Sequence, residues 1–215
     1  MNRILIAVPC HEMMHSDFTR CLMELDRPDG WEIGYAQIVG TLVYTARTLI
    51  ANKAVEMGFD NVLWIDSDMT FKPDTLIRLA EDMDQHNLDM VCGIYFTRKM
   101  PIMPSIHKHL HWQIKEDGWV DTDCRCYTDY PENSLFEIAC CGFGCVMTSV
   151  RLLKDMNEKY GSPFYPLMGM GEDTTFCWRA TQNGYRIFCD SSVKVGHIGQ
   201  YVFNEETWKA NMEGK

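Results

Sequence analysis

In the stretch Val62-Leu63-Trp64-Ile65-Asp66-Ser67-Asp68-Met69, apolar residues run directly into two aspartates that are one residue apart. The apolar run is typical of a buried strand, with Asp60-Asn61 before it and Lys72-Pro73 after it. Because charge is costly to bury, Asp66 and Asp68 are expected at or just beyond the strand's end. Ligands bind at that end of open α/β sheets, and paired carboxylates there suit a divalent cation. An ordinary turn is the alternative, since Asp and Ser also favour turns.

Apolar strands and amphipathic helices alternate over the first 96 residues. We expect strands over 4–8, 31–39, 62–65 and 89–96, and helices over 16–25, 42–57 and 72–83, with Ser16 as a candidate cap. This alternation implies a mostly parallel sheet with helices on both faces. The predicted apolar face of the helix over 42–57 comprises Leu42, Ala46, Leu49, Ile50, Ala54 and Met57. Arg47 lies off that face, so it is either a solvated surface residue or a candidate to meet a phosphate.

The second half of the chain has a different pattern. Residues 97–133 show no clear period and are expected to form loops and short strands, such as 112–115 and 119–121. Residues 135–150 are apolar but interrupted by Gly142-Phe143-Gly144, which predicts a broken or bulged strand or a close approach of a ligand. Helices over 151–160, 171–183 and 205–212 and strands over 185–189 and 193–197 complete the prediction. The expected fold is one α/β domain with a smaller antiparallel part in this half.

Composition limits the classes of function. The 215 residues are 46% hydrophobic and carry a net charge of −10, which predicts one sizeable domain and disfavours nucleic-acid binding, because that usually needs a basic stripe. No apolar stretch approaches the about 18 residues of a transmembrane helix, and the N-terminal run lacks the features of a signal peptide. We therefore expect a cytoplasmic protein with reduced thiols. A zinc knot is a less favoured alternative, for which the candidate ligands are Cys124, Cys126, Cys140, Cys141 and Cys145.

Two further segments carry groups that suit chemistry. Glu172-Asp173 follows Gly171 at a predicted helix start, where acids either stabilise the helix dipole or act as a general base and bind a substrate hydroxyl. His197 follows an apolar run and lies between Gly196 and Gly199, which suits either a metal ligand at a strand end or a solvent-facing loop histidine.

One enzyme pattern matches the paired aspartates alone. Asp66-Ser67-Asp68-Met69-Thr70 fits the Asp-x-Asp-x-Thr pattern of haloacid-dehalogenase-type phosphatases, in which Asp66 would be the nucleophile and Asp68 a general acid, with magnesium. That motif usually follows the first strand of its domain, whereas other strands and helices precede it here. A zinc- or nucleotide-binding module without turnover is a third possibility.

The order of the motifs resembles the GT-A glycosyltransferases, in particular family-2-like enzymes. The matching segments are Ile6-Ala7-Val8-Pro9, Ala46-Arg47-Thr48-Leu49, the stretch 63–69 with Phe71 and Pro73-Asp74, Gly93-Ile94-Tyr95 with Arg98-Lys99, Gly142-Phe143-Gly144, 171–176 and Gly196-His197. The resemblance implies one Rossmann-type domain over 1–215, with a nucleotide-binding half (1–96) and an acceptor-binding half (97–215). It implies sugar transfer from a nucleotide-sugar donor to a carbohydrate or other hydroxyl acceptor, with Mn²⁺ or Mg²⁺. Inversion by direct displacement is a further hypothesis.

The same resemblance implies a role for each candidate residue. Asp68 and His197 would bind the metal, and Asp66 would contact the donor ribose or reach the metal through water. The other donor-binding residues would be Pro9, Cys10, Arg47 and Ser67. Asp173 would take the proton from the acceptor hydroxyl while Glu172 holds that acceptor. The donor-sugar and acceptor pocket would be lined by Gly142, Phe143 and Gly144.

Overall fold

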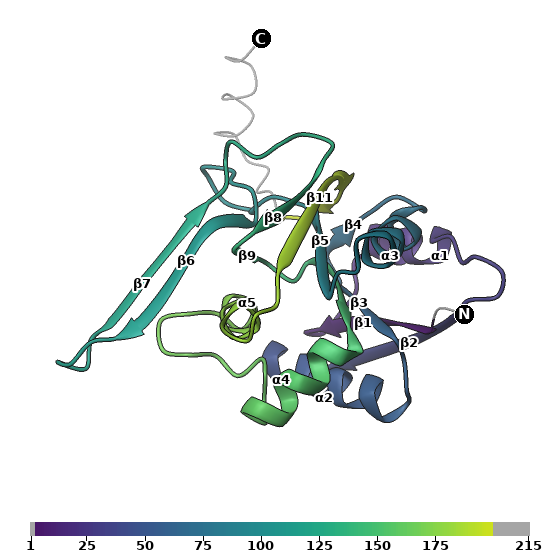
Figure 1. Cartoon of the computed structure of the whole chain (residues 1–215). Helices are drawn as coiled ribbons and strands as arrows, with labels where there is room; N and C mark the ends of the chain where they lie inside the picture. The colour runs from purple at the N-terminus through teal and green to yellow at the C-terminus, as the bar shows by residue number, and fades with distance from the viewer. Residues whose placement is uncertain (1–2, 200–215) are drawn as a thin grey trace, which may run out of the picture.

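A seven-stranded sheet forms the centre of the computed structural model, which describes residues 3–199 (Figure 1). Its order is β2-β1-β3-β10-β5-β11-β8. The strands are β1 (Arg3–Cys10), β2 (Glu32–Val39), β3 (Asn61–Ile65), β5 (Met90–Ile94), β8 (Leu135–Ile138), β10 (Cys145–Ser149) and β11 (Ile187–Lys194). All except β8 and β10 run in the same direction, which confirms the mostly parallel sheet. The helix expected over 205–212 lies outside the described residues.

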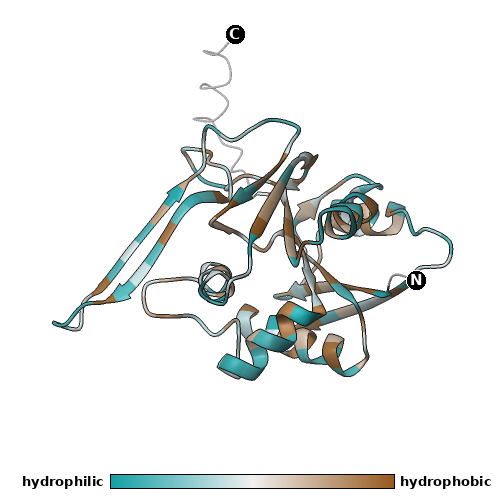
Figure 2. Cartoon of the chain, in the orientation of Figure 1, coloured by the Kyte–Doolittle hydropathy of each residue, from teal (hydrophilic) through white to brown (hydrophobic). Residues whose placement is uncertain are grey.

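Helices cover both faces of this sheet, as the alternating pattern predicts. On one face, α2 (Val43–Glu56), α4 (Val150–Tyr160) and α5 (Glu172–Gln182) pack around Trp64, which is fully buried. On the other face, α1 (Ser16–Glu24) and α3 (Thr75–His86) pack around Leu63 and Ile65. The central strands are accordingly apolar along most of their length, while polar residues gather on the outer helix surfaces (Figure 2). Burial on both faces explains why these strands read as continuous apolar runs.

Strand β10 lies between β3 and β5 in the sheet. Without β10, these two strands, which follow one another among the long strands of the chain, would be expected to be neighbours. Strand β10 runs antiparallel to both β3 and β5, with Val146 opposite Trp64 on one side and Cys92 on the other. The broken strand predicted over 135–150 therefore becomes three strands in three places. These are the sheet edge β8, the short strand β9 (Cys140–Cys141), and the central β10.

A long hairpin projects from the body where loops and short strands were expected (Figure 1). It consists of β6 (Ile106–Ile114) and β7 (Val120–Cys126), and β6 also pairs with β9. Most of its residues are exposed or half-buried on either face. Because neither face is fully covered, the hairpin lacks the apolar alternation by which a half-buried strand is recognised.

Two local predictions were wrong at the helices. His15, not Ser16, caps α1, because its Nδ1 accepts a hydrogen bond from the backbone N–H of Asp17 at 3.2 Å. In α2 the buried face includes Arg47, which is 2% exposed, whereas Leu42 and Leu49 are 62% and 50% exposed. The helix is therefore rotated from its expected orientation, and polar partners described below compensate the burial of Arg47.

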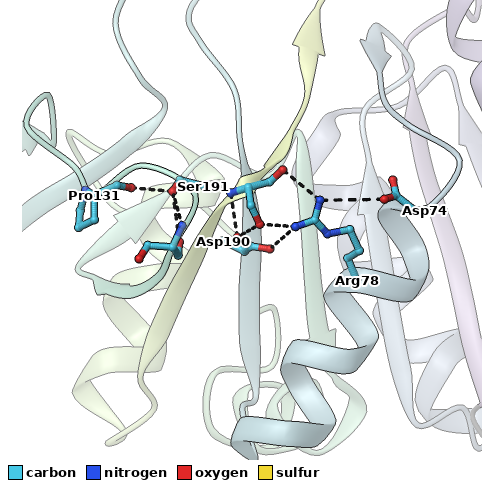
Figure 3. Close-up of polar contacts among 7 residues, drawn as sticks. Asp74, Arg78, Pro131, Asp190 and Ser191 are labelled. Atoms are coloured by element: carbon cyan, nitrogen blue, oxygen red, sulfur yellow. Dashed lines mark hydrogen bonds and ion pairs between the residues drawn. The ribbon is translucent and has the colours of Figure 1, made fainter.

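An ion-pair cluster joins α3 to β11 outside the cavity described below (Figure 3). Arg78 Nη2 lies 3.5 Å from Asp190 Oδ2, and Arg78 Nη1 donates to the carbonyl of Ser192 at 3.2 Å. On the other side of β11, the hydroxyl of Ser191 donates to the carbonyl of Pro131 at 2.6 Å. The cluster therefore connects α3 through β11 to the loop before β8.

Asp82, one turn beyond Arg78, should make stability depend on pH. Burial and the negative charge of Asp190 raise the pKa of Asp82 from 3.8 to about 6, and within residues 3–199 its buried Oδ2 has no hydrogen-bond partner. Because the folded-state pKa is raised, ionisation destabilises the fold, and stability falls as the pH rises from 3.8 to about 6. After solvent screening we expect Asp82→Asn to add about 1 kcal/mol at pH 8, or roughly 3 °C in melting temperature, and little at pH 4.

The control for this prediction is Glu81→Gln, which removes the same charge from an exposed neighbour. It should change the melting temperature little at either pH. An equal gain from Asp82→Asn at pH 4 and pH 8 would contradict the assignment of the raised pKa to Asp82.

Candidate functional site

A cavity of about 770 Å³ opens where β1 and β3 end. The predicted residues that line it are Pro9, Cys10, Arg47, Asp66, Ser67, Asp68 and Glu172. The remaining lining residues were not predicted from the sequence, and they are His11, Glu12, Gly40, Thr41, Leu42, Val43 and Ala46. Gly40 lies between β2 and α2, and its backbone is left-handed, with φ of 76°. A glycine at this position was the one local feature of the sequence that could have indicated this part of the cavity. The fold therefore gathers the expected donor residues at the ligand-binding end of the sheet.

Asp68 and His197 are brought together by a small second sheet. In it β4 (Met69–Thr70) pairs with β12 (Gly196–His197), and His197 lies opposite Met69. The Nε2 atom of His197 is 3.7 Å from Asp68 Oδ2. Its Nδ1 lies 2.9 Å from the carbonyl of Phe96, which can only accept, so Nδ1 carries a proton and Nε2 is the ring nitrogen directed at Asp68. This is the arrangement in which a backbone carbonyl orients a metal-binding histidine.

Arg98 also contacts Asp68, although no role was predicted for Arg98 from the sequence. Its Nη1 lies 2.6 Å from Asp68 Oδ2 and donates to the carbonyl of Ile198 at 3.1 Å. Burial opposes ionisation of Asp68, but the contacts with His197 and Arg98 prevail and lower the pKa of that carboxyl. The basic pair Arg98-Lys99 after a strand was the only sequence signal for this contact.

The chemistry of the donors at Asp68 fits a divalent cation in part. A carboxylate oxygen and an imidazole nitrogen face each other there, and both are ligands for Mn²⁺. Asp66, the third expected ligand, bonds Arg47 instead, through Oδ1 at 2.9 Å from Nη2. Across residues 3–199, no group of three His, Cys, Asp or Glu side chains is arranged to hold a metal ion. In the described part of the protein, Asp68 and His197 are therefore a pair of candidate ligands.

The two acids at the start of α5 face different surroundings. Glu172 reaches the cavity, and burial together with the charge of Asp173 raises its pKa, against the opposing charge of Arg47. The Oδ1 atom of Asp173 accepts hydrogen bonds from the backbone N–H and the hydroxyl of Thr174 at 2.6 and 3.1 Å. Asp173 and His197 are not among the residues that line the cavity of Asp66.

The expectation that Phe143 lines a sugar pocket was wrong. Its side chain is 1% exposed, and its ring packs against those of Phe164 and Phe176, with centroids 5.3 and 5.2 Å away. The flanking Gly142 and Gly144 also lie outside the lining of the cavity. Both approach Tyr95, whose hydroxyl accepts a hydrogen bond from the backbone N–H of Gly144 at 3.3 Å. The glycines therefore make room for Tyr95.

Gly142→Ala should destabilise the fold through Tyr95. An added Cβ would lie 2.0 Å from the Tyr95 hydroxyl and 3.1 Å from its Cζ. Overpacking of this kind costs about 1–3 kcal/mol, so we expect the melting temperature to fall by roughly 5 °C. Adding Tyr95→Phe, which removes the hydroxyl, should restore part of the loss. A double variant as unstable as the sum of the two single variants would show that the hydroxyl is not the obstacle.

Part of the chain resembles a known protein family in sequence, and the fold resembles several solved structures. Residues 54–156 match the family model described as Glycosyl transferase family 2, while the curated protein sequences give no match. The structure of A197 from STIV has a TM-score of 0.65 at 20% identity, covering 93% of this chain and 87% of that one. GalNAc-T7 with UDP, GalNAc and Mn²⁺ gives 0.61 at 10% identity, and S. aureus TarS 1-349 gives 0.53 at 16%. This chain is covered to 93% and 92% but spans only 43% and 60% of those two proteins.

The chain has a family-2-like GT-A fold. The matched segment of this GT-A domain begins within α2 and ends within α4, so it includes Asp66 and Asp68. The family match supports glycosyl transfer as the activity. None of the helices in residues 3–199 combines the length and apolar character needed to cross a membrane.

Proposed function

We propose that this protein is a metal-dependent glycosyltransferase that moves a hexosyl group from a nucleotide-sugar donor to a hydroxyl of a carbohydrate or other acceptor. One observation carries the proposal. The cavity where β1 and β3 end is lined by Asp66 and Asp68, which follow β3, and by Glu172, which precedes Asp173 in α5. Separate acids thus serve the donor and the acceptor.

The donor side would be formed by residues of the 1–96 half. Pro9, Cys10, Asp66 and Ser67 line the cavity where the nucleotide would lie. Asp68 and His197 would hold Mn²⁺ or Mg²⁺, which supplies positive charge to the diphosphate as it leaves. The GalNAc-T7 structure contains UDP and Mn²⁺. In a protein of net charge −10, Arg98 is the other positive group in contact with Asp68.

The acceptor side would be formed by residues of the 97–215 half. Asp173 would accept the proton of the acceptor hydroxyl, and Glu172 would hold the acceptor at the cavity. Thr174 fixes Asp173 through Oδ1, so the second oxygen is the one to act as base. Attack from the face opposite the leaving diphosphate would invert the anomeric configuration, which NMR of the product tests.

We propose a cytoplasmic location on the state of the cysteines. All 10 are free thiols, and most are buried. Reducing compartments keep thiols in this state.

A panel of nucleotides and nucleotide sugars tests the proposed activity. We expect UDP or GDP to raise the melting temperature only when MnCl₂ is present, and one nucleotide sugar to be hydrolysed slowly in the absence of an acceptor. Hydrolysis of small phosphate esters that Asp66→Asn blocks would instead establish a phosphatase. Unfolding by zinc chelators, with neither activity, would establish a binding module.

A further inference from the structure

Arg47 is a buried charge at the boundary between the two acid pairs. Its side chain is 2% exposed on the sheet-facing side of α2, and its guanidinium lies 5.2 Å from the centroid of the Phe143 ring. A buried charge destabilises a protein unless it is paired and hydrogen-bonded. The partners of Arg47 therefore show what its burial serves.

Each nitrogen of the guanidinium is directed at a different protein group. Nη2 bonds Asp66 Oδ1 at 2.9 Å, and Nη1 donates to the carbonyl of Phe143 at 3.4 Å. Nε lies 3.7 Å from Glu172 Oε1, which is too far for a hydrogen bond, and within residues 3–199 this buried atom has no other partner. The Nε–H of Arg47 is thus directed at Glu172, the proposed acceptor-side acid, without a hydrogen bond to it.

The contacts favour a positioning role over a role as ligand of the donor phosphates. Each of the three guanidinium nitrogens already faces a protein group, with Nη2 at Asp66, Nη1 at the carbonyl of Phe143 and Nε at Glu172. The rigid, planar guanidinium fixes the relative positions of the groups that it bonds. It also offsets the negative charges of Asp66 and Glu172, because burial raises the pKa of both carboxyls and the charge of Arg47 opposes that rise in each.

We infer that Arg47 is a positioning residue that ties the donor-side Asp66 to the acceptor-side Glu172, and that it does not bind the donor phosphates. This inference rests on the proposed function. The free Nε–H closes onto Glu172 when the acceptor is bound, so the tie is completed only in the productive complex. Loss of Arg47 therefore lowers the rate of transfer more than it weakens binding of the nucleotide.

The test compares Arg47→Met and Arg47→Lys with the matched control Arg78→Met, which removes a half-buried ion-paired arginine outside the cavity. We expect Arg47→Met to lower kcat about 100-fold, the size of effect that a misplaced reacting group gives. Arg47→Lys keeps the charge but not the fork, so it should recover about a tenth of the lost rate. Binding of UDP or GDP with MnCl₂ should weaken less than about fivefold, and Arg78→Met should leave kcat unchanged.

Two further measurements distinguish a residue that positions Asp66 and Glu172 from one that binds the donor phosphates. In Arg47→Met, the affinities for UDP and for uridine should fall by the same small factor. If GDP is the nucleotide that binds, the pair to compare is GDP and guanosine. A loss above tenfold for the diphosphate alone would overturn the inference, as would an unchanged kcat or an equal loss in Arg78→Met. The variant Arg47→Met/Glu172→Gln should be no slower than the slower single variant, because both remove the same tie.

Failure of the proposed function would be recognised separately. In that case the wild-type protein binds neither nucleotide with MnCl₂ and hydrolyses no nucleotide sugar. The tie is then tested by urea unfolding, where Arg47→Met and Glu172→Gln should shift the midpoint non-additively and Arg78→Met and Glu172→Gln additively. If Arg47→Met does not fold, Arg47→Lys replaces it in each comparison, and additive effects overturn the inference.

Discussion

Asp68→Ala should abolish the thermal stabilisation that UDP or GDP gives in the presence of MnCl₂. In the proposed site, Asp68 Oδ2 lies 3.7 Å from His197 Nε2, so removal of the carboxylate would leave His197 as the single proposed metal ligand. Loss of groups that only support a metal ligand costs about 10- to 100-fold in affinity, so loss of the ligand should cost at least about 100-fold. The measurement is the shift in melting temperature with nucleotide, with and without MnCl₂.

The fold itself should survive this substitution. The backbone carbonyl of Asp68 accepts a hydrogen bond at 2.8 Å from the N–H of Ile198, the residue after β12, and this bond does not depend on the side chain. Asp74→Ala, which removes a half-buried acid near the start of α3, is the control and should keep the full stabilisation. If Asp68→Ala still responds to UDP only with MnCl₂, the metal lies elsewhere.

Asp173→Asn should stop transfer while nucleotide binding stays intact. A general base contributes about 10²- to 10⁴-fold, so we expect kcat to fall about 1000-fold. Asparagine keeps the shape of the side chain, and its carbonyl oxygen can still accept the 2.6 Å hydrogen bond from the N–H of Thr174. The stabilisation by UDP or GDP with MnCl₂ should therefore match that of the wild-type protein.

Glu172→Gln should lower kcat less than Asp173→Asn does, which would distinguish the roles of Glu172 and Asp173. Glu172 is expected to hold the acceptor, so its substitution should raise the acceptor KM more than it lowers kcat. If instead Asp173→Asn transfers sugar at the normal rate, or if the product keeps the donor's anomeric configuration, Asp173 is not the base of a direct displacement.

The site shows what a sequence can and cannot predict. Asp66 and Asp68 were placed correctly because the cost of burying charge puts acids after the end of an apolar strand. The buried position of Arg47 was missed, because the spacing of apolar residues in α2 allows two overlapping faces and the burial depends on distant partners. The contact of Arg98 with Asp68 was missed for the same reason, since nothing near Arg98 in the sequence indicates its partner.

The fold divides in a similar way. Most strands and helices of the first 96 residues were predictable because each buries either a continuous apolar run or an apolar helix face that the local sequence records. The hairpin of β6 and β7 was not, because both of its faces are partly exposed. The position of β10 was not predictable either, because pairing between strands far apart in the sequence leaves no local pattern.

The place of β10 determines how the polypeptide can fold as it leaves the ribosome. A nascent chain that ends before Cys145 has β3 and β5 but not the strand that separates them, so each keeps an open edge. Open edges of apolar strands recruit other chains, which makes such a fragment prone to aggregation. The proposed nucleotide-binding and acceptor-binding halves are therefore not separate folding units, because the central sheet takes strands from both.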